Sequence, residues 1–262
     1  MERRSALEIT VLLSAGLGAA ALLTVGPLLP AAGAGSLRFA ATGLATWGWF
    51  SWQLWRLRVL NVEVDPSGQP GGLRATLGRA TAVTLVRSWL IALVAGHLLL
   101  PPVQGDGALN VGLHYSAAAL LDGVDGRVAR HGGVVTRLGA HLDVATDALG
   151  LLVAPLVAVR AGRLPPWYLL LAFAYPVFRA ALAVQKRRGR AVYPERLRPD
   201  PRARFFAGVQ MAVVAASFYP VLPVNLLWAA ATAAMFPTLI LFAREWRIVS
   251  GAVPPVPAAV PR

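Results

Sequence analysis

The stretch LLDGVDGRVARHGGVVTRLGAHLDVATDALG, residues 120–150, holds four of the chain's seven aspartates. Asp122 and Asp125 are three residues apart, so both lie on one face of a helix. Asp143 and Asp147 are four residues apart and share a face of the next helix in the same way. Two consecutive glycines between the pairs are expected to reverse the chain. Two antiparallel helices would then bring the four carboxylates together.

The rest of the sequence is typical of a membrane protein. Of its 262 residues, 56% are hydrophobic and 14% are charged, and the mean hydropathy is +0.59. Soluble domains carry about 25% charged residues. Apolar runs of about 20 residues, the length that crosses a bilayer as a helix, recur along the chain. Because backbone groups in lipid must be satisfied internally, we predict an all-α fold, a polytopic membrane helix bundle.

Eight membrane helices are predicted, and one polar linker divides them. Residues 1–74 are expected to hold two N-terminal transmembrane helices and a cytoplasmic linker, residues 75–250 a six-helix core, and residues 251–262 a flexible tail. The predicted helices are 7–29, 37–55, 80–101, 109–131, 134–160, 165–185, 203–222 and 225–247. A cleaved signal peptide is the alternative for the first helix, but its apolar run is longer than a usual signal peptide has.

The formal net charge of +13 comes almost wholly from arginine, since Lys186 is the only lysine. Basic residues near the ends of membrane helices mark cytoplasmic loops and contacts with anionic lipids, so we expect membrane lipids and not nucleic acid as partners. With a cytoplasmic N-terminus most arginines follow this rule, but Arg160 and Arg163 fall in an expected outer loop. We therefore expect a multi-pass protein of the cytoplasmic membrane.

Four carboxylates at one depth of a membrane need positive partners. An aspartate at the bilayer centre costs about 2.5–3.5 kcal/mol on insertion scales, and repulsion between neighbouring carboxylates adds to this cost. Oxygen ligands without histidine or cysteine favour Mg²⁺, Mn²⁺ or Ca²⁺, and four carboxylates balance two divalent ions. We therefore predict two Mg²⁺ ions, with Mn²⁺ as an alternative, acting on a diphosphate.

Small residues and an arginine extend the aspartates into the longer pattern Asp122-x2-Asp125-Gly126-x2-Ala129-Arg130-x8-Gly139-x3-Asp143-x3-Asp147. All eight fixed positions and every gap resemble the signature of the CDP-alcohol phosphatidyltransferase family. The resemblance covers residues of about 75–248 and leaves the first two helices outside.

The resemblance implies transfer of a phosphatidyl group from CDP-diacylglycerol, or a similar CDP-linked lipid, to an alcohol acceptor, with release of CMP. It assigns metal binding to the four aspartates and makes Asp147 the catalytic base for the acceptor hydroxyl. The implied CDP-lipid contacts are Thr84, Gly126, Ala129, Arg130, Thr136 and Gly139. Thr84 belongs to an element that resembles the family's Asn-x2-Thr, with Thr81 in place of the asparagine. We also expect a homodimer and an active site facing the cytoplasm.

The acceptor is not assigned by the pattern. Family members that use glycerol 3-phosphate often have a lysine after the last aspartate, and Ala148 at this position disfavours a phosphatidylglycerophosphate synthase. Arginines of two later helices are candidates for binding a phosphorylated acceptor such as an inositol phosphate, with lipid anchoring as the alternative. These candidates are Arg179, Arg188, Arg202 and Arg204.

Two other classes of membrane protein also use intramembrane aspartates. An intramembrane Mg²⁺-dependent prenyltransferase uses Asp-x3-Asp elements, but residues 201–262 contain no aspartate for the second element that it needs. A cation transporter needs ionisable groups strung across the bilayer, whereas these cluster at one depth. Both are less favoured than the transferase.

Overall fold

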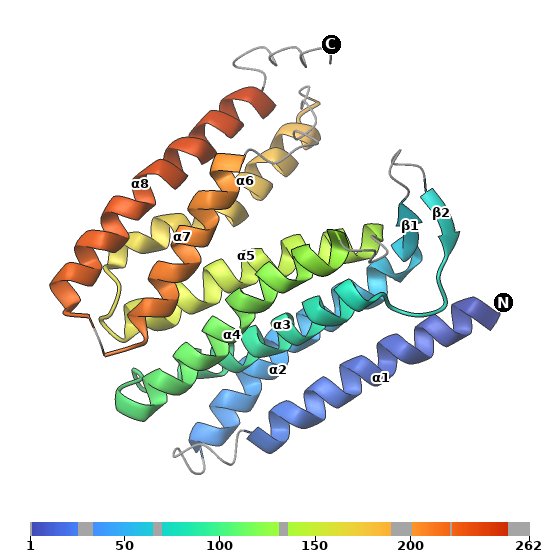
Figure 1. Ribbon diagram of the computed structural model, residues 1–262, viewed down its shortest axis with the longest axis horizontal. Helices are drawn as coiled ribbons and strands as arrows, with labels where there is room; N and C mark the ends of the chain where they lie inside the picture. The colour runs from blue at the N-terminus through green and yellow to red at the C-terminus, as the bar shows by residue number, and fades with distance from the viewer. Residues whose placement is uncertain are drawn as a thin grey trace.

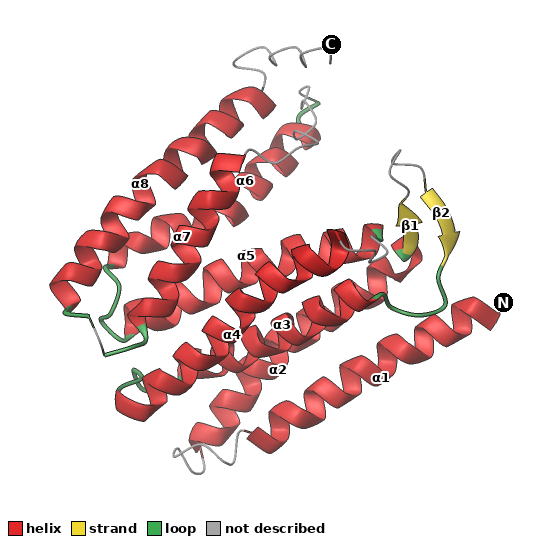
Figure 2. Cartoon of the chain, viewed as in Figure 1, coloured by secondary structure: helices red, strands yellow, loops and turns green. Residues whose placement is uncertain are grey.

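The computed structural model describes residues 2–25, 34–64, 70–130, 136–189, 201–220 and 222–250. Within them the chain forms eight α-helices and one antiparallel β-hairpin (Figure 1), and Figure 2 shows how small the hairpin is beside the helices. The helices are α1 (Glu2–Val25), α2 (Ala34–Leu57), α3 (Arg79–Gly96), α4 (Gly105–Arg130), α5 (Arg137–Arg160), α6 (Leu169–Arg187), α7 (Pro201–Ser217) and α8 (Val224–Val249). The strands are β1 (Val62–Val64) and β2 (Pro70–Leu73), and short 3₁₀ turns are η2 (Arg58–Leu60), η3 (His97–Leu99) and η4 (Pro166–Tyr168). The predicted all-α bundle is confirmed.

The ends of the helices differ from the predicted ones for local reasons. α5 begins at Arg137 because Thr136 caps it: the Thr136 side chain accepts a hydrogen bond from the backbone N–H of Gly139. α7 ends at Ser217, before the predicted residue 222. Pro220 explains this early end, because proline lacks an N–H and disfavours helical geometry in the residue before it.

Five of the described helical segments are long and apolar enough to cross a membrane: Ser5–Val25, Arg79–Leu99, Arg137–Arg160, Pro166–Arg187 and Val224–Val249. Eight membrane helices were predicted. The other three are α2, α4 and α7; α7 is short, with 17 residues, and α4 carries aspartates of the motif. That these three helices also cross the membrane stays a prediction.

α3 is the central helix of the N-terminal part of the bundle, and it packs against α2, α4 and α5 (Figure 1). α5 also packs against α6 and α7, and both of these pack against α8. One buried apolar cluster joins α3, α4 and α5 to the last three helices, and a second joins α1, α2, α3 and α5. The N-terminus, the hairpin, the end of α4 and the start of α5 lie toward one end of these helices (Figure 1).

The first two helices are packed tightly onto α3. The indole N–H of Trp47 on α2 donates to the Ala15 carbonyl of α1 at 2.8 Å, and the indole N–H of Trp89 on α3 donates to the Gly18 carbonyl at 3.1 Å. The Trp47 side chain is buried between helices. Its close approach to α1 requires glycine at position 18, because a Cβ there would lie 2.3 Å from the Trp47 ring.

The linker between α2 and α3 folds against the start of α5. β1 and β2 pair as a hairpin, and the buried amide of Asn61 donates to the carbonyls of Arg74 and Thr76. Glu63 of β1 forms an antiparallel bridge with Thr136 and an ion pair with Arg74. The linker is therefore attached to the helix that carries Asp143 and Asp147.

Arg160 and Arg163, the two exceptions to the charge rule, bind backbone carbonyls. Arg160 donates to the Leu100 carbonyl at 3.0 Å. Arg163 donates to the carbonyls of Ser217, the last residue of α7, and of Tyr219, just after it, each at 2.8 Å. Carbonyls at a helix end lack intrahelical partners, and a guanidinium with its five N–H donors can satisfy several of them. These two arginines therefore join neighbouring segments through hydrogen bonds, which explains their place in the expected outer loop.

Replacing Gly18 by alanine should lower the thermal stability of the protein. The added Cβ would overlap the Trp47 ring, and overpacking of this kind costs about 1–3 kcal/mol. Gly16→Ala on the same helix is the matched control, because a Cβ there has nothing within 4 Å. Thermal unfolding in detergent should show a lower midpoint for Gly18→Ala alone. Equal midpoints for the two variants would contradict the close packing of α1 on α2.

Candidate active site

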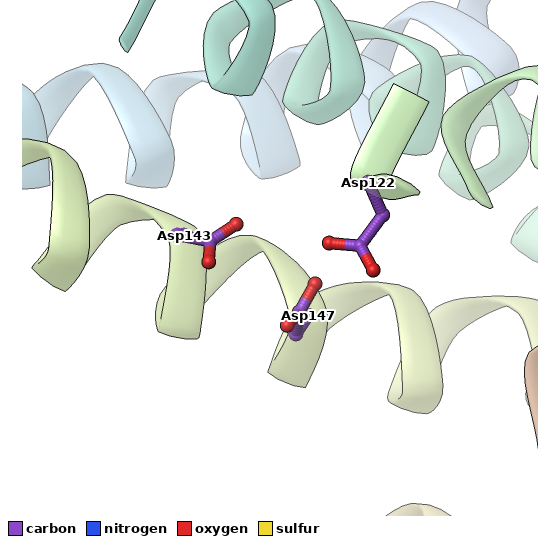
Figure 3. A group of neighbouring side chains, drawn as sticks. All are labelled: Asp122, Asp143 and Asp147. Carbon is purple, nitrogen blue, oxygen red and sulfur yellow. The ribbon is translucent and has the colours of Figure 1, made fainter. Parts of the chain in front are cut away.

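Three aspartates from two helices come together toward the end of the bundle that carries the hairpin. Asp122 lies on α4, and Asp143 and Asp147 lie on successive turns of α5. One carboxylate oxygen of each lies within 4.8 Å of those of the other two. Figure 3 shows the three side chains around a common space. Their side chains are 36%, 42% and 35% exposed, in chain order, so the cluster is accessible to a ligand.

Part of the predicted site lies outside what the structure describes. The side chains of four predicted residues are not described, although their backbone belongs to α4; these are Asp125, Gly126, Ala129 and Arg130. Residues 131–135, where the two glycines were expected to reverse the chain, are not described either. The roles predicted for the four residues stay predictions.

Arg87 of α3 lies against all three described aspartates. Its guanidinium contacts Asp143 at 2.5 Å, Asp147 at 2.5 Å and Asp122 at 2.8 Å. The Arg87 side chain is only 3% exposed, so it approaches the carboxylates from inside the bundle. The planar guanidinium, with donors that point in several directions, can pair with more than one carboxylate. The described part of the site is thus built from three helices.

Sequence reasoning missed Arg87, although its signal was present. The residue stands in the apolar helix 80–101, and an ionisable residue within a membrane helix is a functional candidate by default. We expected positive charge among the aspartates but assigned all of it to metal ions. The structure supplies part of that charge from the protein itself.

The three aspartates still fit a divalent cation with Arg87 present. Three carboxylates and one guanidinium leave a net charge of −2, which one divalent cation balances. Carboxylate oxygens are the hard ligands that Mg²⁺ and Mn²⁺ prefer, and each carboxylate has two oxygens. The described side chains therefore suffice for one ion. A second ion would need the charge of Asp125 as well.

Buried hydroxyl groups fix α3 to α5 next to the cluster. The hydroxyls of Ser88 and Thr146 lie 2.7 Å apart, and both residues are buried. One of the two hydroxyls donates to the other, and the hydroxyl that accepts can donate to a carbonyl one turn earlier in its own helix, either Ser88 to Thr84 or Thr146 to Leu142. Ser88 follows Arg87 and Thr146 precedes Asp147, so this pair holds the two charged side chains in register. Neither residue was predicted.

The start of α5 brings together three residues discussed from the sequence. Thr136 is the N-cap, and its Oγ1 accepts from the Gly139 N–H at 3.0 Å. A Cβ on Gly139 would lie 3.1 Å from the Thr81 hydroxyl and 3.2 Å from that of Thr136, and both threonines are buried. Thr84 is buried one turn after Thr81 on α3. The absence of a side chain at position 139 allows both hydroxyls to lie close to the α5 backbone.

The predicted acceptor arginines are exposed at the facing ends of two helices. Arg179 and Arg188 lie toward the C-terminal end of α6, and Arg202 and Arg204 lie in the first turn of α7. All four side chains are exposed. Their role in binding an acceptor stays a prediction.

A small cavity of about 10 Å³ lies beside Asp147. Arg87, Tyr115 and Thr146 are among the residues that line it. This volume has room for about one water-sized group. The cavity is too small for an acceptor alcohol, and the carboxylate of Asp147 is accessible because its side chain is 35% exposed.

Comparison with known proteins identifies the family. The model of the CDP-alcohol phosphatidyltransferase family matches residues 77–243, which is more than half of the chain. This chain belongs to that family, as the aspartate pattern predicted, and with five candidate spans it is a multi-pass integral membrane protein.

One relative is the CDP-diacylglycerol–serine O-phosphatidyltransferase of Mycobacterium leprae (strain TN). It is 34% identical over 115 residues, and the match covers 42% of this chain and 37% of the relative. The chain therefore matches little more than a third of that protein's length. No solved structure matches the chain.

Gly139→Ala should destabilise the protein by about 1 kcal/mol or more, because the new Cβ would press on two buried hydroxyls, one of which caps α5. Gly123→Ala on α4 is the control, since a Cβ there meets nothing within 4 Å. Thermal unfolding in detergent measures the difference. A Gly139→Ala midpoint equal to that of the control would show that α3 and α5 are not closely packed here.

Proposed function

We propose that the protein transfers a phosphatidyl group from CDP-diacylglycerol, or a related CDP-linked lipid, to an alcohol and releases CMP in phospholipid biosynthesis. The observation that carries this proposal is the cluster of Asp122, Asp143 and Asp147 in a chain of this family. A cation-dependent reaction of a diphosphate suits this cluster better than a structural role, because its three carboxylates keep a net charge of −2 after pairing with Arg87.

The proposed reaction exchanges one phosphorus–oxygen bond for another. The acceptor hydroxyl oxygen forms a bond to the phosphorus that carries the diacylglycerol, and the bond from this phosphorus to the oxygen of CMP breaks. CMP leaves with the electron pair of that bond. The proton of the hydroxyl passes to the carboxylate of Asp147, whose side chain is 35% exposed.

Asp122, Asp143 and Asp147 would hold Mg²⁺ or Mn²⁺, and Asp125 would complete a two-ion site. When bound, such ions neutralise phosphate oxygens and make the attacking alcohol more acidic. The protein's own part is to hold the carboxylates in place through the Arg87 ion pairs and the Ser88–Thr146 hydrogen bond. Preorganised charges of this kind need no rearrangement during the reaction.

Binding of the CDP-lipid is proposed at the start of α5 and the end of α4. Thr136 and Gly139 lie at the N-terminus of α5, where free backbone N–H groups and the helix dipole favour an anionic group. Gly126, Ala129 and Arg130 are on the neighbouring end of α4. Thr84 is a proposed contact on α3. The roles of these residues come from the family resemblance.

Serine is the acceptor that we propose to test first, because the Mycobacterium leprae relative is named for serine. A phosphorylated acceptor, such as an inositol phosphate or glycerol 3-phosphate, is the second candidate, because exposed arginines surround the ends of α6 and α7. We further propose that the active site faces the cytoplasm from the cytoplasmic membrane and that the protein is a homodimer.

Asp147→Asn should reduce CMP release by at least about 100-fold, because general-base catalysis contributes roughly 10²–10⁴-fold. The assay uses purified protein with CDP-diacylglycerol, Mg²⁺ or Mn²⁺, and a panel of alcohols that includes serine, inositol, inositol phosphate and glycerol 3-phosphate. Asp106→Asn is the matched control, since Asp106 is exposed in the first turn of α4, away from the cluster. Normal turnover by Asp147→Asn would rule out its role as the base.

If the acceptor is phosphorylated, Arg188→Ala and Arg204→Ala should each raise its KM several-fold and leave the KM for CDP-diacylglycerol unchanged. An ion pair with an exposed side chain contributes up to about 1 kcal/mol, which corresponds to a change of about fivefold in KM. Arg38→Ala is the control, because Arg38 is exposed near the start of α2. An unchanged acceptor KM in both variants would leave these arginines with lipid contacts alone.

A further inference from the structure

Arg87 occupies the position where a cation would be needed. It is a buried residue of α3, and its two terminal nitrogens contact Oδ1 of each of the three aspartates at 2.5–2.8 Å. These aspartates come from α4 and α5, so one guanidinium neutralises carboxylates from two other helices. Because arginine keeps its charge at any accessible pH, this positive charge is permanent.

A divalent cation and Arg87 would use the same carboxylates. A bound Mg²⁺ takes oxygen ligands at about 2.0–2.1 Å, and the three carboxylates that offer them lie within 4.8 Å of one another. A cation among them would therefore be only a few ångströms from the guanidinium. Two positive charges at that distance repel, and the repulsion is stronger in a partly buried site than in water. The Arg87 pairs must weaken or rearrange when the cation binds.

We propose that Arg87 is a built-in competitor of the divalent cation: it holds the three carboxylates together when no cation is bound, and it sets the cation concentration at which the site fills. This inference rests on the metal site of the proposed function. It adds a positioning residue from α3 to the four aspartates. It also gives Arg87 two opposite effects, stabilisation of the fold and weakening of cation binding.

The test compares thermal unfolding of the full-length protein in detergent across a series of MgCl₂ concentrations at constant ionic strength. In the absence of Mg²⁺, the Arg87→Gln variant should unfold at a lower temperature than the unchanged protein, because three carboxylates lose their counter-charge. The rise of its unfolding midpoint with Mg²⁺ should then occur at a Mg²⁺ concentration at least about tenfold lower, because the variant lacks the positive charge that repels the cation. Arg79→Gln on the same helix is the control, since Arg79 is exposed and its loss should leave the Mg²⁺ midpoint unchanged.

Arg87→Lys covers the case in which the glutamine variant does not fold. It keeps the positive charge but lacks the planar fork that reaches three carboxylates, so its Mg²⁺ midpoint should lie below that of the unchanged protein. Direct titration with Mn²⁺, followed by the electron paramagnetic resonance signal of free Mn²⁺, should give the same order of affinities.

The outcomes separate the inference from the proposed function. If the unchanged protein responds to Mg²⁺ but the Arg87 variants respond at the same or higher concentrations, Arg87 is not a competitor, and the proposed metal site stands. If the unchanged protein neither gains stability from Mg²⁺ nor binds Mn²⁺, the proposed metal site is wrong, and the inference falls with it.

Discussion

The contact of one buried guanidinium with three carboxylates is the interaction on which the site depends. Arg87 comes from α3, Asp122 from α4, and Asp143 and Asp147 from α5, so the charges bind three helices at one point. Without the charge of Arg87 or of a metal ion, the carboxylates would repel one another in a partly buried site, where charge is screened less than in water. The hydrogen bond between Ser88 and Thr146 keeps the same helices in register one residue away. Electrostatics and packing therefore support the same geometry.

Much of the fold and part of the site were predictable, because both depend on local spacing. Apolar runs gave eight helices in the right order, and the spacing of Asp143 and Asp147 placed them on one face of α5. Arg87 was not assigned, because its partners are on other helices and nothing in the local sequence names them. The hairpin was missed because Val62–Val64 is too short to show the alternation that marks a strand.

The two N-terminal helices also have a structural role that the sequence alone did not show. They carry no recognised motif. Trp49, Trp52 and Trp55 of α2 are exposed, but Trp47 is buried and hydrogen-bonds to α1. Trp89 of α3 also hydrogen-bonds to α1. Burial of an indole needs a partner for its N–H, and here backbone carbonyls of α1 supply it. The extra helices thus brace the helix that carries Arg87.

The bridge between Glu63 and Thr136 bears on how far the family's six-helix unit can be separated from what precedes it. Thr136 caps the helix of Asp143 and Asp147, and its backbone pairs with Glu63 of β1. This strand lies outside the residues that match the family model. A chain cut at the start of α3 would lose that strand and would expose the Trp89 surface. The N-terminal segment therefore packs against the residues that match the family model, and we expect an insertion or a fusion in this linker to affect the active site.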